Sequence, residues 1–189
     1  ERMALQASAS LPTRKRVWGQ IVREKIRSQG RALVALRGID AGLFRLAQRV
    51  RSGDPQNIEA QAAVRYWKHI FERPGFRRSP DGQDENRFLN YGYAVLRGMA
   101  ARAVCAAGLH PSLGVHHHNR YDAYRLADDL MEPFRPVVDR AAVELANEMG
   151  PHAPLAPETK RRLVSGLVGR HLVGEEWRTL GDLVQRAAF

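Results

Sequence analysis

Three consecutive histidines, at positions 116–118, are followed within one short stretch by four carboxylates. These carboxylates are Asp122, Asp128, Asp129 and Glu132. A neutral imidazole and one or two carboxylates that converge on an open position can bind a divalent cation, since histidine tolerates Mn²⁺ and carboxylates favour Mg²⁺ or Mn²⁺. The residue types between positions 108 and 136 therefore suggest a divalent-cation site.

The four carboxylates belong to an expected helix that starts near Asp122, with this aspartate as its N-cap. In such a helix Asp128 and Asp129 lie four and three positions before Glu132, so the three side chains can share one face. Pro133 then ends the turn. The alternative is that Asp122 only caps the helix, that the next two aspartates are solvated, and that the histidines line a loop.

A fifth carboxylate, Glu59, lies on a helix expected from Asp54 and Pro55 to about Phe71. In helical projection it falls on the apolar side, together with Ala62, Ala63, Tyr66 and Ile70. A carboxylate on a face meant for burial must be paired, protonated or bound to a metal. The milder alternative is that Glu59, in the first turn, only complements the helix dipole.

Two ordered motifs resemble the CRISPR-associated protein one family, the metal-dependent DNA endonuclease and integrase of CRISPR adaptation. They are GLHPSLGVHH at 108–117 and DLMEPFRP at 129–136. NYGY at 90–93 and Asn119 after the histidines are most similar to the type II branch. The stretch 57–67 resembles the segment that carries the first catalytic glutamate of the family.

This resemblance extends over about residues 14–188 and implies a set of site residues. Glu59, His117 and Glu132 are expected to be the catalytic triad that binds the metal, with Asp129 as a possible accessory carboxylate. The implied cofactor is Mg²⁺ or Mn²⁺. Members of the family usually begin with a small β-rich dimerisation domain that this sequence lacks, so the sequence is interpreted as the helical catalytic domain of a longer chain.

The resemblance also implies a reaction and its partners. The reaction is phosphoryl transfer in DNA, in which the 3′-hydroxyl of a short duplex, or water, attacks a phosphodiester. The implied partners are double-stranded DNA (protospacer and repeat), CRISPR-associated protein two, and a second copy of this chain in a homodimer within a larger complex. The implied location is the bacterial cytoplasm.

Composition points to nucleic acid independently of the resemblance. Thirty Lys and Arg residues against twenty Asp and Glu give a net charge of +10, which favours a polyanionic partner because phosphate neutralisation releases counterions. The basic residues expected to contact DNA are Arg77, Arg78, Lys160, Arg161 and Arg162. Simple exposure to solvent is an equally open explanation for the first two.

The expected architecture is one all-α helical bundle over residues 1–189, since 189 residues suffice for a single core and strand-like alternation is scarce. The helices not yet mentioned are expected at about 13–37, 41–52, 88–109, 137–149, 158–172 and 176–189. Cys105 is expected to be a buried thiol in a reducing compartment. No membrane partner is expected, because no apolar run approaches the ~18 residues that a span needs.

A second hypothesis is a non-catalytic, DNA-binding helical subunit in which the carboxylates only support the fold. Glu59 separates the two hypotheses, since a pure binding module has little reason to keep a carboxylate on an apolar face.

Overall fold

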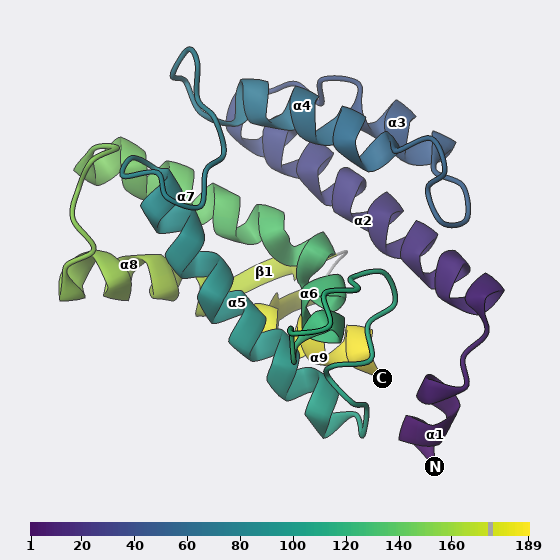
Figure 1. The fold of residues 1–189 in the computed structure, drawn as a ribbon. Helices are drawn as coiled ribbons and strands as arrows, with labels where there is room; N and C mark the ends of the chain where they lie inside the picture. The colour runs from purple at the N-terminus through teal and green to yellow at the C-terminus, as the bar shows by residue number, and fades with distance from the viewer. Residues whose placement is uncertain (174–175) are drawn as a thin grey trace.

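The computed structural model describes residues 1–173 and 176–189, and helices dominate it (Figure 1). The helices are α1 (Arg2–Ala7), α2 (Leu11–Arg37), α3 (Leu43–Arg49), α4 (Ile58–Ile70), α5 (Asn86–Ala106), α6 (Arg125–Met131), the 3₁₀ turn η1 (Glu132–Phe134), α7 (Arg135–Met149), α8 (Pro157–Val168) and α9 (Leu180–Ala188). The strands β1 (Arg170–Val173) and β2 (Glu176–Thr179) form an antiparallel hairpin, with Arg170 opposite Thr179. The expected all-α bundle is confirmed, and this hairpin is the only sheet in the described parts of the chain.

The longest helix, α2, lies between α3 and α4 on one side and α7 on the other (Figure 1). It begins after Ser10, whose hydroxyl accepts a hydrogen bond from the Thr13 amide at 3.3 Å, and ends at Gly38 in the left-handed conformation, φ 71°. The side chains buried along one stripe of α2 include Trp18, Val22, Ile26 and Leu33. One side of α2 packs against α3 and α4, and another packs against η1 and α7.

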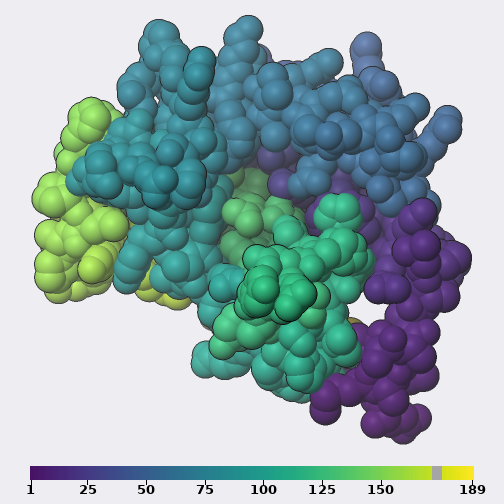
Figure 2. Space-filling view, in the orientation of Figure 1, coloured from purple at the N-terminus to yellow at the C-terminus, as the bar shows by residue number. Residues whose placement is uncertain are grey.

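Two groups of helices meet along α2. We call α2, α3 and α4 the first helix group and α5 to α9 the second helix group. The space-filling view shows the same division, with bright green residues from the segment before and within α6 lying against purple and blue residues of the first group (Figure 2). Within the second group, Gly92 of α5 allows close approach of α7, because a Cβ at this position would lie 2.5 Å from Val138 Cγ1.

The C-terminal region differs from its sequence-based prediction. The helix predicted at 158–172 ends at Val168, and the helix predicted from 176 begins at Leu180, because residues 170–173 and 176–179 form the paired strands β1 and β2. The later start has a local cause. The Thr179 hydroxyl accepts a hydrogen bond from the Asp182 amide at 3.1 Å, and the Asp182 carboxylate accepts one from the Thr179 amide at 3.3 Å. This capping box fixes the first turn of α9 at Leu180.

Two further predicted helix starts lie too early in the sequence. The Asp54 carboxylate does accept hydrogen bonds from the amides of Ile58 and Glu59, both at 2.9 Å, but α4 begins only at Ile58. The prediction that Asp122 caps a helix is wrong. Its carboxylate accepts a hydrogen bond from the Tyr124 amide at 2.8 Å in a turn, and α6 begins at Arg125.

Cys105 corrects another expectation. Cys105 is exposed on α5, whereas the sequence predicted a buried thiol. The apolar run around it suggested burial, but residue 105 falls on the side of the helix opposite the buried Val104 and Ala103 pair.

In the described part of the chain, no helix combines the length and the apolar character that crossing a bilayer would require.

Candidate functional site

The histidine-containing loop between α5 and α6 is organised around one buried carboxylate, Asp129. Its oxygens accept hydrogen bonds from the amides of Val115 at 2.5 Å, His116 at 3.1 Å and His117 at 3.2 Å. Gly114 makes this wrapping possible, because a Cβ there would lie 2.8 Å from the His117 carbonyl oxygen and 3.1 Å from Asp129 Oδ2. The loop therefore takes its shape from a residue of α6.

Asp129 also holds the His117 ring. His117 Nδ1 lies 2.7 Å from Asp129 Oδ1, and this hydrogen bond raises the pKa of His117 against the opposing effect of burial. Burial alone would raise the pKa of Asp129, but the hydrogen bonds from His117 and the loop amides lower it below its usual value. With Nδ1 donating to the carboxylate, Nε2 carries the lone pair that can bind a metal.

Trp18 of α2 docks the loop against the first helix group. The buried indole stacks on the His116 ring with centroids 4.0 Å apart and planes 4° from parallel. The His117 ring meets the same indole edge-on at 6.1 Å. Burial lowers the pKa of His116, so its ring is held as a neutral stacking partner.

Two carboxylates from different helix groups converge beside this loop. Glu59, in the first turn of α4, and Glu132, in η1, both contact the Lys25 ammonium, at 2.6 and 2.5 Å. Their oxygens therefore lie no more than about 5 Å apart, the sum of those two distances. Because Lys25 is on α2, three separate elements supply this cluster.

The Glu132 side chain is the most buried member of the cluster. Burial would raise its pKa, but the charges of Lys25 and Arg135 lower it below its usual value. Arg135 Nε donates to Oε1 at 2.8 Å. Oε2 is buried outside hydrogen-bond geometry, with the Lys25 ammonium as its ion-pair partner. Burial lowers the pKa of Lys25 and the charges of Glu132 and Glu59 raise it, with a net rise.

The Lys25 ammonium lies between the two carboxylates and forms an ion pair with each. Among the described residues, no three His, Cys, Asp or Glu side chains lie close enough together to hold one metal ion. The structure thus brings Glu59 and Glu132 together and places His117 nearby, where the Glu132 charge acts on its pKa. Two carboxylates and an imidazole are donors that suit Mg²⁺ or Mn²⁺.

The predicted common face of Asp128, Asp129 and Glu132 is wrong. Asp128 contacts Arg97 of α5, with Nε 2.6 Å from Oδ1, and Asp122 contacts the same guanidinium at 2.6 Å. Asp129 faces the loop amides, and Glu132 faces Lys25. The helix changes to the 3₁₀ turn η1 at Glu132, which alters the direction of that side chain relative to the preceding turn.

The basic residues predicted to bind DNA differ in their surroundings. Arg77 is exposed, whereas the Arg78 guanidinium donates to Ser79 O at 2.6 Å and to Asn86 Oδ1 at 3.0 Å. The α8 residues have partners on the surface: Lys160 lies over the Tyr91 ring at 5.5 Å, Arg161 pairs with Glu158, and Arg162 pairs with Glu158 and Glu148. Arg78 is therefore part of the framework as well as basic.

Sequence reasoning missed Lys25 as a site residue and placed it on a generally basic helix. Its position did carry a signal. Lys25 lies seven residues after Trp18 and three after Val22, on the stripe that α2 buries. A lysine on such a stripe needs a buried partner, as Glu59 does on α4.

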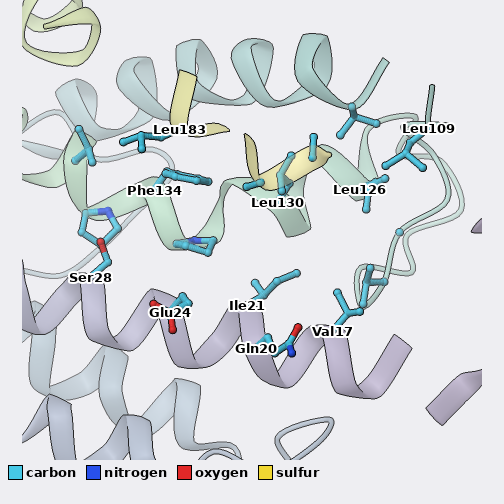
Figure 3. Close-up of a pocket in the computed structure, with 18 of the residues that line it drawn as sticks. Val17, Gln20, Ile21, Glu24, Ser28, Leu109, Leu126, Leu130, Phe134 and Leu183 are labelled. Atoms are coloured by element: carbon cyan, nitrogen blue, oxygen red, sulfur yellow. The ribbon is translucent and has the colours of Figure 1, made fainter. Parts of the chain in front are cut away.

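A large apolar groove lies elsewhere, on a neighbouring face of α2. It has a volume of about 1030 Å³, and Val17, Ile21, Leu126, Leu130 and Phe134 are among the side chains that line it (Figure 3). None of the residues of the predicted metal triad lines it. The groove is therefore separate from the carboxylate cluster, although α2 borders both.

Comparisons with known proteins agree with the site's motifs. The family model described as CRISPR associated protein Cas1 matches residues 6–151. The CRISPR-associated endonuclease Cas1 of Neisseria meningitidis is 39% identical over 172 residues, which cover 87% of this chain and 54% of the relative. A Cas1 endonuclease of Pyrobaculum aerophilum is 34% identical over 113 residues, which cover 59% and 38%. The chain thus spans about half the length, or less, of these curated relatives.

Solved structures share the fold. A casposase bound to its integration product superposes with a TM-score of 0.77 at 20% identity, covering 97% of this chain and 62% of the casposase. A Cas1 protein from Thermotoga maritima gives a TM-score of 0.77 at 19% identity, covering 94% and 64%. The match of the family model to most of the sequence, together with these relatives, shows that the chain belongs to the CRISPR-associated protein Cas1 family.

Proposed function

We propose that this chain is the helical catalytic domain of a metal-dependent DNA endonuclease and integrase that inserts short DNA duplexes into a repeat array in the bacterial cytoplasm. The names of the Cas1 relatives as endonucleases support the nuclease activity, and the casposase solved with an integration product supports DNA insertion. The observation that carries the proposal is the convergence of Glu59 and Glu132 on one cationic position beside His117.

Glu59, Glu132 and His117 would hold the divalent cation, Mg²⁺ or Mn²⁺, with the imidazole binding through Nε2. When bound, the cation would polarise the phosphate and stabilise the charge that develops on it. Asp129 fixes the tautomer and the direction of the His117 ring through the 2.7 Å hydrogen bond to Nδ1. The possible accessory role of Asp129 is thus best explained as orientation of a ligand.

Lys25 and Arg135 hold the two carboxylates in place. Arg135 holds Glu132 Oε1 at 2.8 Å, which leaves Oε2 directed at the shared cationic position. The charges of Lys25 and Arg135 lower the pKa of Glu132, which favours its ionised form. The Lys25 side chain has four flexible carbons, so its ammonium can turn from the carboxylates to a DNA phosphate.

Strand transfer conserves the number of phosphodiester bonds, whereas hydrolysis converts one phosphodiester into a phosphomonoester and a hydroxyl. The oxygen of a 3′-hydroxyl forms a bond to phosphorus and loses its proton, while the bond from that phosphorus to the leaving 3′-oxygen breaks and that oxygen gains a proton. In the nuclease reaction a water oxygen takes the place of the attacking hydroxyl. The task of the protein is therefore positioning and neutralisation of charge.

The partners that we propose are protospacer and repeat DNA, CRISPR-associated protein Cas2, and a second copy of the chain. Structures described as Cas6-RT-Cas1–Cas2 complexes share this fold, with TM-scores of 0.76 and 0.74, which supports the choice of Cas2. The net charge of +10 supports DNA as the substrate.

The alternative is a DNA-binding helical subunit without catalysis. The position of Lys25 favours this alternative, since its ammonium already forms ion pairs with both carboxylates without a metal. The two proposals differ in what they expect from the carboxylates: catalysis requires them, and DNA binding does not.

Glu59→Gln tests the proposal in the full-length protein with its partner. The substitution keeps the size of the side chain and removes its charge, so strand transfer of a labelled duplex into repeat DNA with Mn²⁺ should fall at least ~100-fold. DNA affinity should stay within about twofold, because the basic surface is unchanged. Glu72→Gln is the matched control, since Glu72 is a glutamate 76% exposed that pairs with Arg37 away from the site. Near-normal strand transfer by Glu59→Gln would favour the binding subunit.

A further inference from the structure

A buried aspartate on α7 accepts hydrogen bonds from two tyrosines of two other helices. Asp139 has an exposed fraction of 1% and lies in the core. The Tyr66 hydroxyl, on α4, donates to Asp139 Oδ2 at 2.7 Å. The Tyr93 hydroxyl, on α5, donates to Oδ1. One carboxylate thus joins the first helix group to the second.

The bond between Tyr66 and Asp139 lies at the same sequence spacing from each carboxylate of the pair. Tyr66 lies seven residues after Glu59, and Asp139 lies seven residues after Glu132. Seven residues make about two helical turns, or ~10.5 Å along an α-helix, and return a side chain to nearly the same face. On α4, Tyr66 therefore lies about two turns after Glu59. Glu132 lies in η1, which leads directly into α7, so the bond between Tyr66 and Asp139 joins α4 to the helix that follows Glu132.

The other packing contacts do not fix this separation directly. α4 packs chiefly against α2 and α3, whereas α7 packs against α5, α8, η1 and α2. The two elements that carry Glu59 and Glu132 are thus held together mainly through α2. The bond from Tyr66 to Asp139 joins α4 directly to α7, the helix that continues from η1, without an intermediate helix.

A second path leads from Asp139 to Glu132. Tyr93, whose hydroxyl is held by Asp139, has the Arg135 guanidinium 4.6 Å from its ring centroid. Arg135 in turn donates to Glu132 Oε1 at 2.8 Å. The same carboxylate therefore supports Glu59 through Tyr66 and α4, and Glu132 through Tyr93 and Arg135.

Stability alone explains such a group poorly. A buried carboxylate is costly even when it is hydrogen-bonded, and a well-packed apolar residue often serves a core equally well or better. The charges of Arg135 and Arg78 lower the pKa of Asp139, but in the described structure neither guanidinium forms an ion pair with it. The tyrosine hydroxyls are its direct partners, and they give it directional contacts to two helices.

We propose that Asp139 is a positioning residue that, by accepting hydrogen bonds from Tyr66 and Tyr93, sets the separation of Glu59 and Glu132 and thereby the affinity of the site for a divalent cation. The inference rests on the metal site of the proposed function. Tyr66 and Tyr93 act in the same way, through Asp139, and touch neither the cation nor DNA.

The test is Mn²⁺ affinity of the full-length protein, measured by calorimetry for the wild type, Tyr66→Phe and Asp139→Asn. Tyr66→Phe removes one hydroxyl and keeps the ring, so it leaves the core filled. Partners that orient metal ligands from outside the coordination sphere contribute about 10- to 100-fold in affinity, so we expect Mn²⁺ binding to weaken by at least ~10-fold. Saturating Mn²⁺ should restore strand transfer, and DNA affinity should not change.

Val143→Ala is the matched control for loss of core packing. Val143 is fully buried on α7, one turn from Asp139, and takes no part in the hydrogen bonds. This variant should lower the melting temperature and leave Mn²⁺ affinity within about twofold, since a cavity there removes packing but no polar link. Equal weakening of Mn²⁺ binding by Val143→Ala and Tyr66→Phe would overturn the positioning role.

The outcomes separate this inference from the proposed function. If the wild type binds Mn²⁺, Glu59→Gln does not, and Tyr66→Phe binds like the wild type, the positioning role is wrong and the metal site stands. If the wild type and Glu59→Gln show the same Mn²⁺ binding, or none, the metal site is wrong and the inference is overturned with it.

Discussion

The Asp139 carboxyl has almost no contact with water, and burial raises its pKa to about 6, against hydrogen bonds from Tyr93 and Tyr66 that lower it. In the unfolded chain the same group titrates near 3.8. Between these two values the unfolded state releases the proton first, so this group makes the free energy of unfolding fall as pH rises. Below both pKa values Asp139 is protonated in the folded and the unfolded state, so its titration does not change the free energy of unfolding there.

We therefore predict that wild type loses stability relative to Asp139→Asn as pH rises from about 4 to 7. The relative loss should be about 3 kcal/mol, since one pKa unit corresponds to about 1.4 kcal/mol. Denaturant unfolding of both proteins at several pH values measures it. Asp129 and Glu132, whose pKa values are lowered, titrate with the opposite sign, so the difference between the two proteins isolates residue 139. A difference that does not change with pH would contradict the buried ionisation.

Whether a site residue could be identified from the sequence depended on how clearly it interrupted the local pattern. Glu59 could be identified because a carboxylate on an apolar helical face is an anomaly in a simple pattern. Lys25 lies in a helix that carries many basic residues, so the same anomaly was hidden among them. The role of Asp129 as hydrogen-bond acceptor for the loop could not be predicted from sequence spacing. Its partners are backbone amides, whose direction depends on the fold of the loop.

Among the elements, the loop that presents His117 depends on close backbone contact at Gly114. A Cβ at this position would lie 2.9 Å from Arg125 Cβ and 2.8 Å from the His117 carbonyl oxygen. Since neither contact involves the far end of a flexible side chain, the loop would have to move. The orientation of His117 depends on the same hydrogen bonds to Asp129.

We predict that Gly114→Ala lowers the free energy of unfolding by about 1–3 kcal/mol, as overpacking does. It should also weaken Mn²⁺ binding, because His117 moves with the loop. Gly98→Ala is the matched control. No atom lies within 4 Å of a Cβ at Gly98, which is exposed in the interior of α5, so this change should stabilise the protein by up to about 1 kcal/mol. Denaturation and calorimetry together decide the result, and unchanged Mn²⁺ binding in Gly114→Ala would contradict the role of the loop.

Helix existence was easier to predict than helix ends. The amphipathic periodicity that defines α2, α4 and α5 extends over many residues and is set by burial of one face. The ends depend on single side chains. Asp122 could cap a helix or join Arg97, and only the position of α5 decides in favour of Arg97. The strands β1 and β2 likewise replace parts of the predicted helices, and Thr179 and Asp182 fix the start of α9.

For the whole molecule, the net charge of +10 makes the salt concentration the clearest variable in DNA binding. We predict that the logarithm of DNA affinity falls linearly with the logarithm of salt concentration, because each phosphate contact releases counterions. Arg77→Ala should reduce the slope by about one, as loss of one phosphate contact does. Filter binding or anisotropy with a labelled duplex measures the slopes.

Arg78→Ala is the informative comparison, because the Arg78 guanidinium is bonded to Ser79 and Asn86 and lies 5.2 Å from the Tyr93 ring centroid. Its removal should lower stability as well as affinity. An affinity that does not respond to salt would contradict the proposal that phosphate contacts dominate.

The all-α bundle and the family could be predicted for the whole molecule because helical periodicity and ordered motifs persist along most of the sequence. What could not be predicted is how the two helix groups meet. That depends on Lys25, Tyr66 and Asp139, which lie far apart in sequence and show no mutual pattern.

The long sequence separations within the carboxylate cluster bear on the order of events in folding. The contacts between the two helix groups join Lys25 to Glu132, 107 positions later (132 − 25), and Tyr66 to Asp139, 73 positions later. Closing such loops loses chain entropy before any contact is gained, so contacts of this kind form late on the way to the native state. Helical hairpins within each group can assemble early from local contacts. The chain thus becomes able to hold two carboxylates and an ammonium together only in its final docking step, so newly made or partly unfolded copies lack the site.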